Sequence, residues 1–256
     1  MFDNFHYTGH DDPALAANGW LVRTESGGPG VHGTYEADAA SFPADKTAKG
    51  GQALQLHASS DGSVDGTRQA EFGTKDPAFF TGTLAARVFF TDEPADGRNG
   101  DHVNQAFHTI SPSGNSPKYS ELDFEYQPNG GWGAPGPKMD MVSWRSAKQG
   151  DRDTRAIEEP LAGWHILMIT VADGEVTYSV DGRKVFSSGG RSAPKEPMKI
   201  QFSNWFIDLP FTGNRAWDMR VNWVYARDGK KMSAEDVQTA VNSLYASGIN
   251  HANSMP

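Results

Sequence analysis

Cysteine is absent from the chain. Its absence excludes a disulfide framework, a thiolate zinc site and a cysteine nucleophile in one step. It does not identify a cellular compartment, because a chain of 256 residues can bury enough apolar surface to fold without covalent cross-links.

Long apolar runs and an excess of basic charge are absent as well. No stretch approaches the roughly 18 consecutive apolar residues of a membrane-spanning helix, so we expect no membrane partner. Residues 1–5 hold no apolar signal-peptide core, so a secretory leader either does not exist or has been removed. Asp and Glu number 32 against 23 Lys and Arg. Because nucleic-acid affinity comes mostly from basic side chains that neutralise phosphates, we also expect no nucleic-acid partner.

Three common catalytic motifs are missing. The chain contains no G-x-S-x-G nucleophile elbow, no H-E-x-x-H zinc motif and no G-x-x-x-x-G-K-[ST] phosphate-binding loop. Its eight histidines are scattered and give no sequence signal for a metal cluster. We therefore expect neither a cofactor nor a bound metal.

The chain is rich in turn residues and in short alternating segments. Its 28 glycines and 15 prolines favour turns over long helices. Apolar residues recur with period two, and turn residues interrupt them about every 8 to 15 positions, a spacing that predicts an all-β sandwich or barrel. The predicted strands lie at residues 53–57, 82–90, 103–110, 139–144, 164–171, 176–180, 198–202 and 219–226.

Two hairpins and one helix can also be predicted. Asp-Gly pairs at 173–174 and 181–182 supply the positive φ angles of type I′ turns. Ser233 can cap a helix with an apolar stripe, which ends near Ala246. We predict a single domain over residues 1–256, with this C-terminal helix at about 233–246 docked on the sandwich. The loops 91–101 and 127–138 are long, which is typical of binding loops.

One predicted strand alternates acidic and apolar residues without a break. Residues 120–126 read Ser-Glu-Leu-Asp-Phe-Glu-Tyr, so Glu121, Asp123 and Glu125 share one face while the apolar residues share the other. Three adjacent carboxylates are hard to explain as structure, because Asp and Glu are poor strand formers and like charges repel. The Cα atoms of Glu121 and Glu125 should stand roughly 13 Å apart on such a strand.

That geometry has a chemical use. Two Glu side chains that lean inward on a curved strand can approach to about 5–6 Å, near the separation of the two carboxyls in a retaining glycosidase. Three acids this close cannot all ionise cheaply, so at least one should hold its proton near neutral pH, as a general acid must. From the pattern alone a calcium site and a solvated acidic face stay open as alternatives.

In its context this strand resembles the signature of glycoside hydrolase family 16, the laminarinase and lichenase family. Glu-Leu-Asp-Phe-Glu at 121–125 is similar to the family pattern E-[ILV]-D-[IFV]-E. Other segments are similar to family motifs in chain order, and they lie at 82–88, 163–165, 178–182, 197–205 and 219–224. The resemblance covers the chain from about residue 82 to residue 226.

The resemblance implies a concanavalin-A-like β-sandwich, a jelly roll of two antiparallel sheets whose inner sheet forms an open cleft for a polysaccharide. It also assigns roles that the strand geometry leaves open: Glu121 is the nucleophile, Asp123 the assisting acid and Glu125 the acid/base. The expected activity is retaining, endo-acting hydrolysis of β-glycosidic bonds in a β-glucan or galactan. We expect a secreted monomer that takes part in polysaccharide degradation.

Departures from the family pattern and the aromatic residues lead to further expectations. Asn222 stands where family members often have an Asp that is associated with a structural calcium in some of them, which supports the expectation of no metal. Four aromatic residues are expected to bind sugar rings, because sugar C–H faces stack on indole and phenol rings. These are Trp205, by its match to the family's cleft Trp, then Trp132, Trp144, and Tyr119 at the end of the acidic row.

The alternative function is a non-hydrolytic, lectin-like protein on the same fold. The intact acidic row favours the enzyme, because a lectin has no evident use for like charges on a curved face. Assays of reducing-sugar release separate the two hypotheses.

Overall fold

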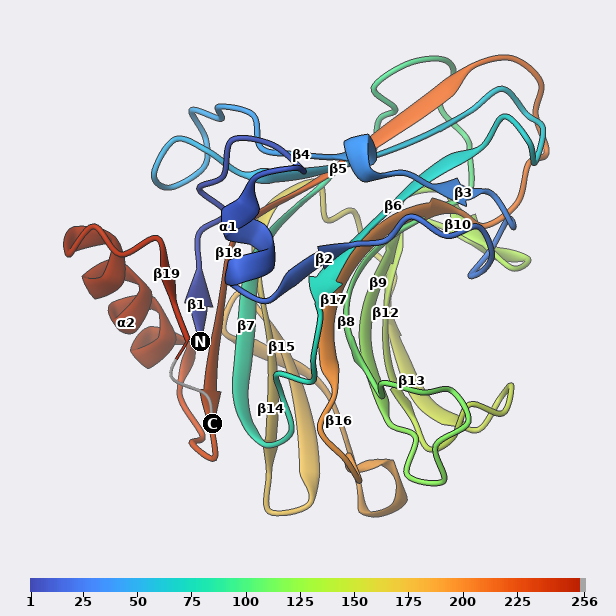
Figure 1. Cartoon of the computed structure of the whole chain (residues 1–256). Helices are drawn as coiled ribbons and strands as arrows, with labels where there is room; N and C mark the ends of the chain where they lie inside the picture. The colour runs from blue at the N-terminus through green and yellow to red at the C-terminus, as the bar shows by residue number, and fades with distance from the viewer. Residues whose placement is uncertain (254–256) are drawn as a thin grey trace.

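The computed structural model describes residues 1–253, and two antiparallel sheets packed face to face make up most of it (Figure 1). The predicted all-β jelly-roll sandwich is thereby confirmed. In the inner sheet the strands follow in the order β2 (Trp20–Val22), β6 (Arg68–Thr74), β17 (Lys199–Phe206), β8 (Val103–Ile110), β9 (Glu121–Gln127), β12 (Lys138–Trp144) and β13 (Arg152–Ile157).

The outer sheet carries both ends of the described chain. Its strand order is β4 (Ala40–Ser41), β5 (Leu54–Ser60), β18 (Arg215–Asp228), β7 (Gly82–Phe90), β14 (Gly163–Ala172), β15 (Glu175–Val180) and β16 (Arg183–Gly189). β1 (Phe2–Asp3) pairs with β18 and with β19 (His251–Ala252), so the first and last strands lie side by side (Figure 1). β3 (Thr34–Tyr35) pairs with β6 in parallel.

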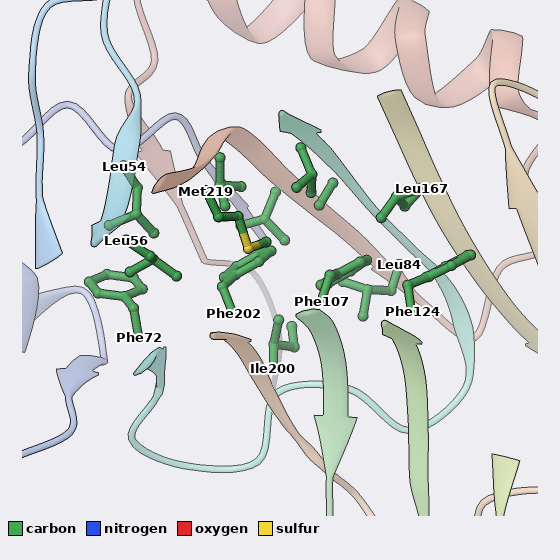
Figure 2. Packing of buried hydrophobic residues seen from close by; sticks show 14 of the residues in the cluster. Leu54, Leu56, Phe72, Leu84, Phe107, Phe124, Leu167, Ile200, Phe202 and Met219 are labelled. Atoms are coloured by element: carbon green, nitrogen blue, oxygen red, sulfur yellow. The ribbon is translucent and has the colours of Figure 1, made fainter. Parts of the chain in front are cut away.

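The core fills the space between the two sheets. Phe107 of β8 stacks between Phe124 of β9 and Phe202 of β17, with ring centroids 6.3 and 5.0 Å apart. Leu84 and Leu167 of the outer sheet meet this inner layer (Figure 2). Phe124 belongs to the apolar face of the acidic strand, so that face of β9 is buried as its alternation predicts.

Both predicted hairpin turns are present. Asp173 and Gly174, between β14 and β15, have φ angles of 54° and 74°. Asp181 and Gly182, between β15 and β16, have φ angles of 50° and 78°. These positive values are those of type I′ turns, whose twist matches that of the flanking strands.

The C-terminal helix is also confirmed. α2 (Ala234–Ala246) begins after Ser233, whose side chain forms a reciprocal capping box with Asp236. Val237 and Val241 bury the apolar stripe of the helix against the outer sheet, where they pack in one cluster with Phe2 and Trp223. In the part of the chain that the structure describes, no helix is both long and apolar enough to cross a bilayer.

The structure adds elements that the hydrophobic pattern does not reveal. α1 (Pro13–Ala17) is too short to show a helical period, and the 3₁₀ turns η1 (Ala37–Ala39) and η2 (Gly190–Ser192) are shorter still. β13 is an edge strand of mostly polar residues, so no apolar alternation marks it. The 127–138 loop contains a small hairpin of β10 (Gly130–Gly131) and β11 (Ala134–Pro135).

Candidate active site

A cleft of about 1040 Å³ lies on the free face of the inner sheet, and alternate residues of β17, β8, β9 and β12 form its floor. Glu121, Asp123 and Glu125 all line this cleft. Leu122 and Phe124, which alternate with them, are fully buried on the opposite face. The period-two pattern of β9 thus brings the three acids together in one open groove.

Strand register determines which side chains flank each acid. The residues directly opposite are Ile110 and Trp144 for Glu121, His108 and Val142 for Asp123, and Ala106 and Asp140 for Glu125. Cβ atoms of directly opposed residues lie about 4.5–5.5 Å apart. A fourth carboxylate, Asp140, therefore stands beside Glu125, whereas Glu121 has an aliphatic and an aromatic neighbour.

Glu121 accepts a hydrogen bond from a phenol. The Tyr119 hydroxyl donates to its Oε2 atom. Burial raises the pKa of Glu121 to about 7, and the charge of Glu125 adds to this effect. Hydrogen bonds from Tyr119 and Asp123 act in the other direction, because they stabilise the carboxylate. The ionised form of Glu121 is thus stabilised by the residues two positions before and two positions after it in the chain.

Asp123 lies between the two glutamates. Trp144 Nε1 donates to its Oδ2 atom at 3.0 Å. Its Oδ1 atom is buried and has no hydrogen-bond partner within residues 1–253. Burial raises the pKa of Asp123 well above its ordinary value, and the charges of Glu121 and Glu125 raise it further. A protonated Asp123 has its Oδ1 atom available to donate toward Glu121, which agrees with the lowering effect of Asp123 on the pKa of Glu121.

Glu125 has different surroundings. Asn104 Nδ2 donates to its Oε1 atom at 2.7 Å. Burial raises the pKa of Glu125 to about 7; Asn104 lowers it and the charge of Asp140 raises it. Lys138 forms an ion pair with Asp140 at 2.8 Å, so a paired carboxylate rather than a free one faces Glu125. The positive charges of Arg152 and Lys138 lower the pKa of Glu125, but burial has the larger effect, so Glu125 favours retention of a proton near neutral pH.

A line of hydrogen-bonded polar side chains crosses the other half of the cleft floor. Gln201 Nε2 donates to Glu71 Oε1 at 3.1 Å, which leaves Gln201 Oε1 to accept from His108 Nε2 at 3.1 Å. Arg23 ends the line with an ion pair to Glu71 at 3.2 Å. Burial lowers the pKa of His108 to about 4, so its imidazole is neutral at pH 7 and its Nδ1 atom is an acceptor. Such an array suits sugar hydroxyls.

Sequence reasoning missed several residues of the site, namely Glu71, His108, Asp140 and Gln201, which line the cleft, and the buried Asn104, which donates to Glu125. A signal existed for two of them. Asn104 and His108 have the same parity in the predicted strand 103–110, but that strand does not alternate clearly between polar and apolar residues. Periodicity could not show which of its faces meets the acids.

The predicted aromatic residues differ in how they are exposed. Trp205 lines the cleft but only 3% of its surface is exposed, whereas Trp132, on the loop above, is 58% exposed. Their ring centroids are 5.9 Å apart. Gly30, at φ +64°, lies against the Trp205 ring so closely that an added Cβ would be 2.5 Å from it. Trp132 therefore presents the free indole surface, and Trp205 supports it from below.

Tyr119 and Trp144 contact the acids directly through hydrogen bonds. Tyr119 is 7% exposed and directs its hydroxyl at Glu121. Trp144 lines the cleft, donates to Asp123, and has the Arg152 guanidinium 4.7 Å from its ring centroid. Both side chains hold carboxylates in position, and the Arg152 cation occupies a face of Trp144.

The acids are surrounded by N–H and O–H donors. Within residues 1–253, no group of three or more His, Asp or Glu side chains is arranged to hold a metal ion. Each acid instead accepts from a protein donor: Tyr119, Trp144 or Asn104. The arrangement can therefore hold a proton and a negative charge side by side at neutral pH, which is what acid/base chemistry at one bond requires.

Comparison with known proteins identifies the fold. No protein-family model matches the chain, and no curated protein matches its sequence. Among solved structures, a β-glucanase of Bacillus licheniformis matches with a TM-score of 0.63 at 15% identity, over 88% of this chain and 95% of that chain. A glycoside hydrolase family 16 protein from a mixed-linkage glucan locus of Bacteroides ovatus, solved with its G4G4G3G product, has a TM-score of 0.65 at 14% identity, over 88% and 98%.

A third structure bears on the alternative function. It is a Mycobacterium tuberculosis protein described as an immunostimulatory antigen and pseudo β-1,3-glucanase, with a TM-score of 0.61 at 17% identity, over 88% of this chain and 96% of that chain. The fold of the present chain is thus the one that family 16 β-glucanases have.

Proposed function

We propose that the protein is a retaining, endo-acting glycoside hydrolase of family 16 that cleaves internal β-glycosidic bonds of a polysaccharide of the β-glucan or galactan type. The observation that carries this proposal is the row Glu121, Asp123 and Glu125 on one strand, in an open cleft, with raised pKa values. An open groove admits the middle of a chain, which supports endo action. The neighbours' fold, with a glucan product in one of them, supports the carbohydrate substrate.

The surroundings of the two glutamates support different roles. Glu121 receives a hydrogen bond from Tyr119, and the neighbouring Asp123 also lowers its pKa, so both residues favour a carboxylate, which suits a nucleophile. Glu125 faces the like charge of Asp140, which favours a protonated carboxyl and suits a general acid. This assignment is the same as the one that the family resemblance implies.

The reaction then has two steps. Glu125 gives its proton to the glycosidic oxygen while Glu121 attacks the anomeric carbon, so that the leaving chain departs as an alcohol and an ester forms with Glu121. Glu125, now ionised, takes a proton from water, and the water oxygen attacks the anomeric carbon and releases the Glu121 carboxylate. A protonated Asp123 donates a hydrogen bond to Glu121 and, because it is neutral, limits the negative charge on the acidic row. Two inversions give net retention.

The proposal includes the wider setting of the enzyme. We expect one catalytic domain that acts as a monomer outside the cell, where polysaccharides are available as substrates. The runner-up function is binding without hydrolysis, which the likeness to a pseudo β-1,3-glucanase favours.

Hydrolysis of a panel of polysaccharides tests the proposal. Wild-type protein should release reducing ends from at least one β-glucan or galactan, and proton NMR should show the β-anomer as the first product. Binding to a glycan with no release of reducing ends would support the lectin-like alternative. A first product with the α-anomer would contradict the retaining mechanism.

An Asp140→Asn variant should shift the pH dependence of the enzyme. The charge of Asp140 raises the pKa of Glu125, so its removal lowers that pKa. Because Glu125 must be protonated in the free enzyme, the alkaline limb of kcat/KM should move to lower pH, by roughly half to one unit. Asp228→Asn, on an exposed residue at the end of β18, is the matched control and should leave the limb unchanged. A shift to higher pH would contradict the acid role of Glu125.

Removal of the exposed indole should weaken substrate binding. Trp132→Ala takes away a stacking surface worth about 0.5–1.5 kcal/mol, so KM should rise by roughly 2- to 10-fold with a small change in kcat. Val64→Ala provides the control, because Val64 is exposed but does not line the cleft. An unchanged KM would show that Trp132 does not contact the glycan.

A further inference from the structure

On the outer face, far in sequence from the acidic row, the side-chain amide of Asn222 is the centre of a dense hydrogen-bond cluster. Asn222 is fully buried and lies where the pairing of β18 with β7 shifts register between Val221 and Trp223. Such a bulge turns a side chain away from its regular direction. Here it directs the amide toward the segment 47–52, which precedes β5.

Both the oxygen and the nitrogen of the Asn222 amide form hydrogen bonds. Its Oδ1 atom accepts from the backbone N–H of Lys49 and from Arg87 Nη1, each at 2.9 Å. Its Nδ2 atom donates to the carbonyl oxygens of Lys49 at 2.8 Å and Gln52 at 3.3 Å, and to the Tyr245 hydroxyl at 3.3 Å. One side chain thus connects four parts of the chain: the segment 47–52, β7, β18 and α2.

This cluster does not fit the calcium that an Asp at this position is associated with in some family members. Calcium requires six to eight oxygen ligands, typically at about 2.3–2.6 Å. Here the two backbone carbonyls already accept from an N–H group, and a guanidinium lies 2.9 Å from the amide oxygen. A nitrogen donor and a neighbouring positive charge both oppose a cation at this place.

We infer that the Asn222 amide performs the structural task of a divalent cation in this chain: its Nδ2 atom binds the Lys49 and Gln52 carbonyls, so that the segment 47–52 is held on the outer sheet without metal. The inference concerns the outer face and does not depend on the proposed function. It follows that calcium adds no stability to the folded chain at this site.

Thermal unfolding tests this inference in two ways. The first compares wild-type protein in excess EDTA with the same protein in millimolar calcium chloride, and the melting temperature should agree within about 1 °C, since a ligand that does not bind the native state cannot stabilise it. A melting temperature that falls in EDTA and recovers with calcium would overturn the inference.

The second compares wild type with Asn222→Asp, both in EDTA. The carboxylate keeps the acceptor for Lys49 and Arg87 but loses the Nδ2 donor and places an oxygen against two carbonyl oxygens. The melting temperature should fall by roughly 5 °C or more, or the variant should not fold. Asn242→Asp is the matched control at an exposed position of α2, where the side-chain oxygen accepts from Lys49 and Gln238; its melting temperature should stay within about 1 °C of wild type. An Asn222→Asp variant as stable as this control would overturn the inference.

Discussion

A Glu121→Gln variant is expected to hydrolyse the substrate polysaccharide at least about 10⁴-fold more slowly than the wild type, because an amide cannot attack the anomeric carbon. The substitution preserves the size of the side chain and an oxygen that accepts from Tyr119, so the cleft should keep its shape. The rate of reducing-sugar release at saturating substrate measures the effect. Activity within tenfold of the wild type would exclude Glu121 as the nucleophile.

The thermal stability of the Glu121→Gln variant is the control for its loss of activity. Burial raises the pKa of Glu121 to about 7 in the folded state, above the ordinary value of about 4.3 that the unfolded chain has. A carboxyl shifted in this direction stabilises the fold at low pH, and this contribution is lost as the pH rises toward 7. Because glutamine does not titrate, Glu121→Gln should be at least as heat-stable as the wild type at pH 8. An inactive variant that is also much less stable would indicate a structural defect.

Chemical rescue distinguishes the nucleophile from the acid. In a Glu121→Gly variant, added azide can occupy the vacated space and attack an activated β-glycoside directly, which should give the α-glycosyl azide. The same treatment of Glu125→Gly should give the β-azide, because azide then attacks the ester formed with Glu121 from the opposite face. Exchanged products would reverse the two roles.

The second large effect is expected for Glu125→Gln. Loss of a positioned general acid should reduce kcat on the polysaccharide by about 10²- to 10⁴-fold. An aryl glycoside with a dinitrophenol leaving group needs no protonation, so its first step should be nearly as fast as in the wild type. The second step lacks its base and should be slow. The expected observation is a burst of one equivalent of phenol per protein followed by slow turnover.

The burst separates this role from a general defect of the cleft. If the variant loses activity on the polysaccharide and on the activated substrate equally, and shows no burst, Glu125 does not act as the acid. Gln127→Glu is unsuitable as a control, because Gln127 is buried beside the Lys138–Asp140 pair. Asp228→Asn again provides an exposed control and should behave as wild type.

The acidic row could be predicted because strand periodicity is local. Glu121, Asp123 and Glu125 lie within five residues, so the alternation along one strand was enough to place them on one face. The Asp-Gly hairpins and the capped helix α2 were predicted for the same reason, since their signals are short-range.

The neighbours of the row could not be predicted, because they depend on register between strands that are distant in sequence. Asp140 comes to lie beside Glu125 only through the pairing of β12 with β9, across a loop whose length allowed several registers. Asn104 reaches Glu125 through the antiparallel pairing of β8 with β9. The burial of Trp205 depends in turn on the distant loop at Gly30, which packs against its ring.

The two faces of β9 leave the strand little freedom to change. Side chains at 121, 123 and 125 belong to the cleft, and those at 122, 124 and 126 are buried in the hydrophobic interior. A substitution at 121, 123 or 125 should remove activity from the cleft without disturbing the interior. A substitution by a smaller residue at 122, 124 or 126 should leave a cavity in the interior without changing a side chain of the cleft. Substitutions are therefore restricted on both faces of β9, so its sequence should change more slowly than that of most of the surrounding chain.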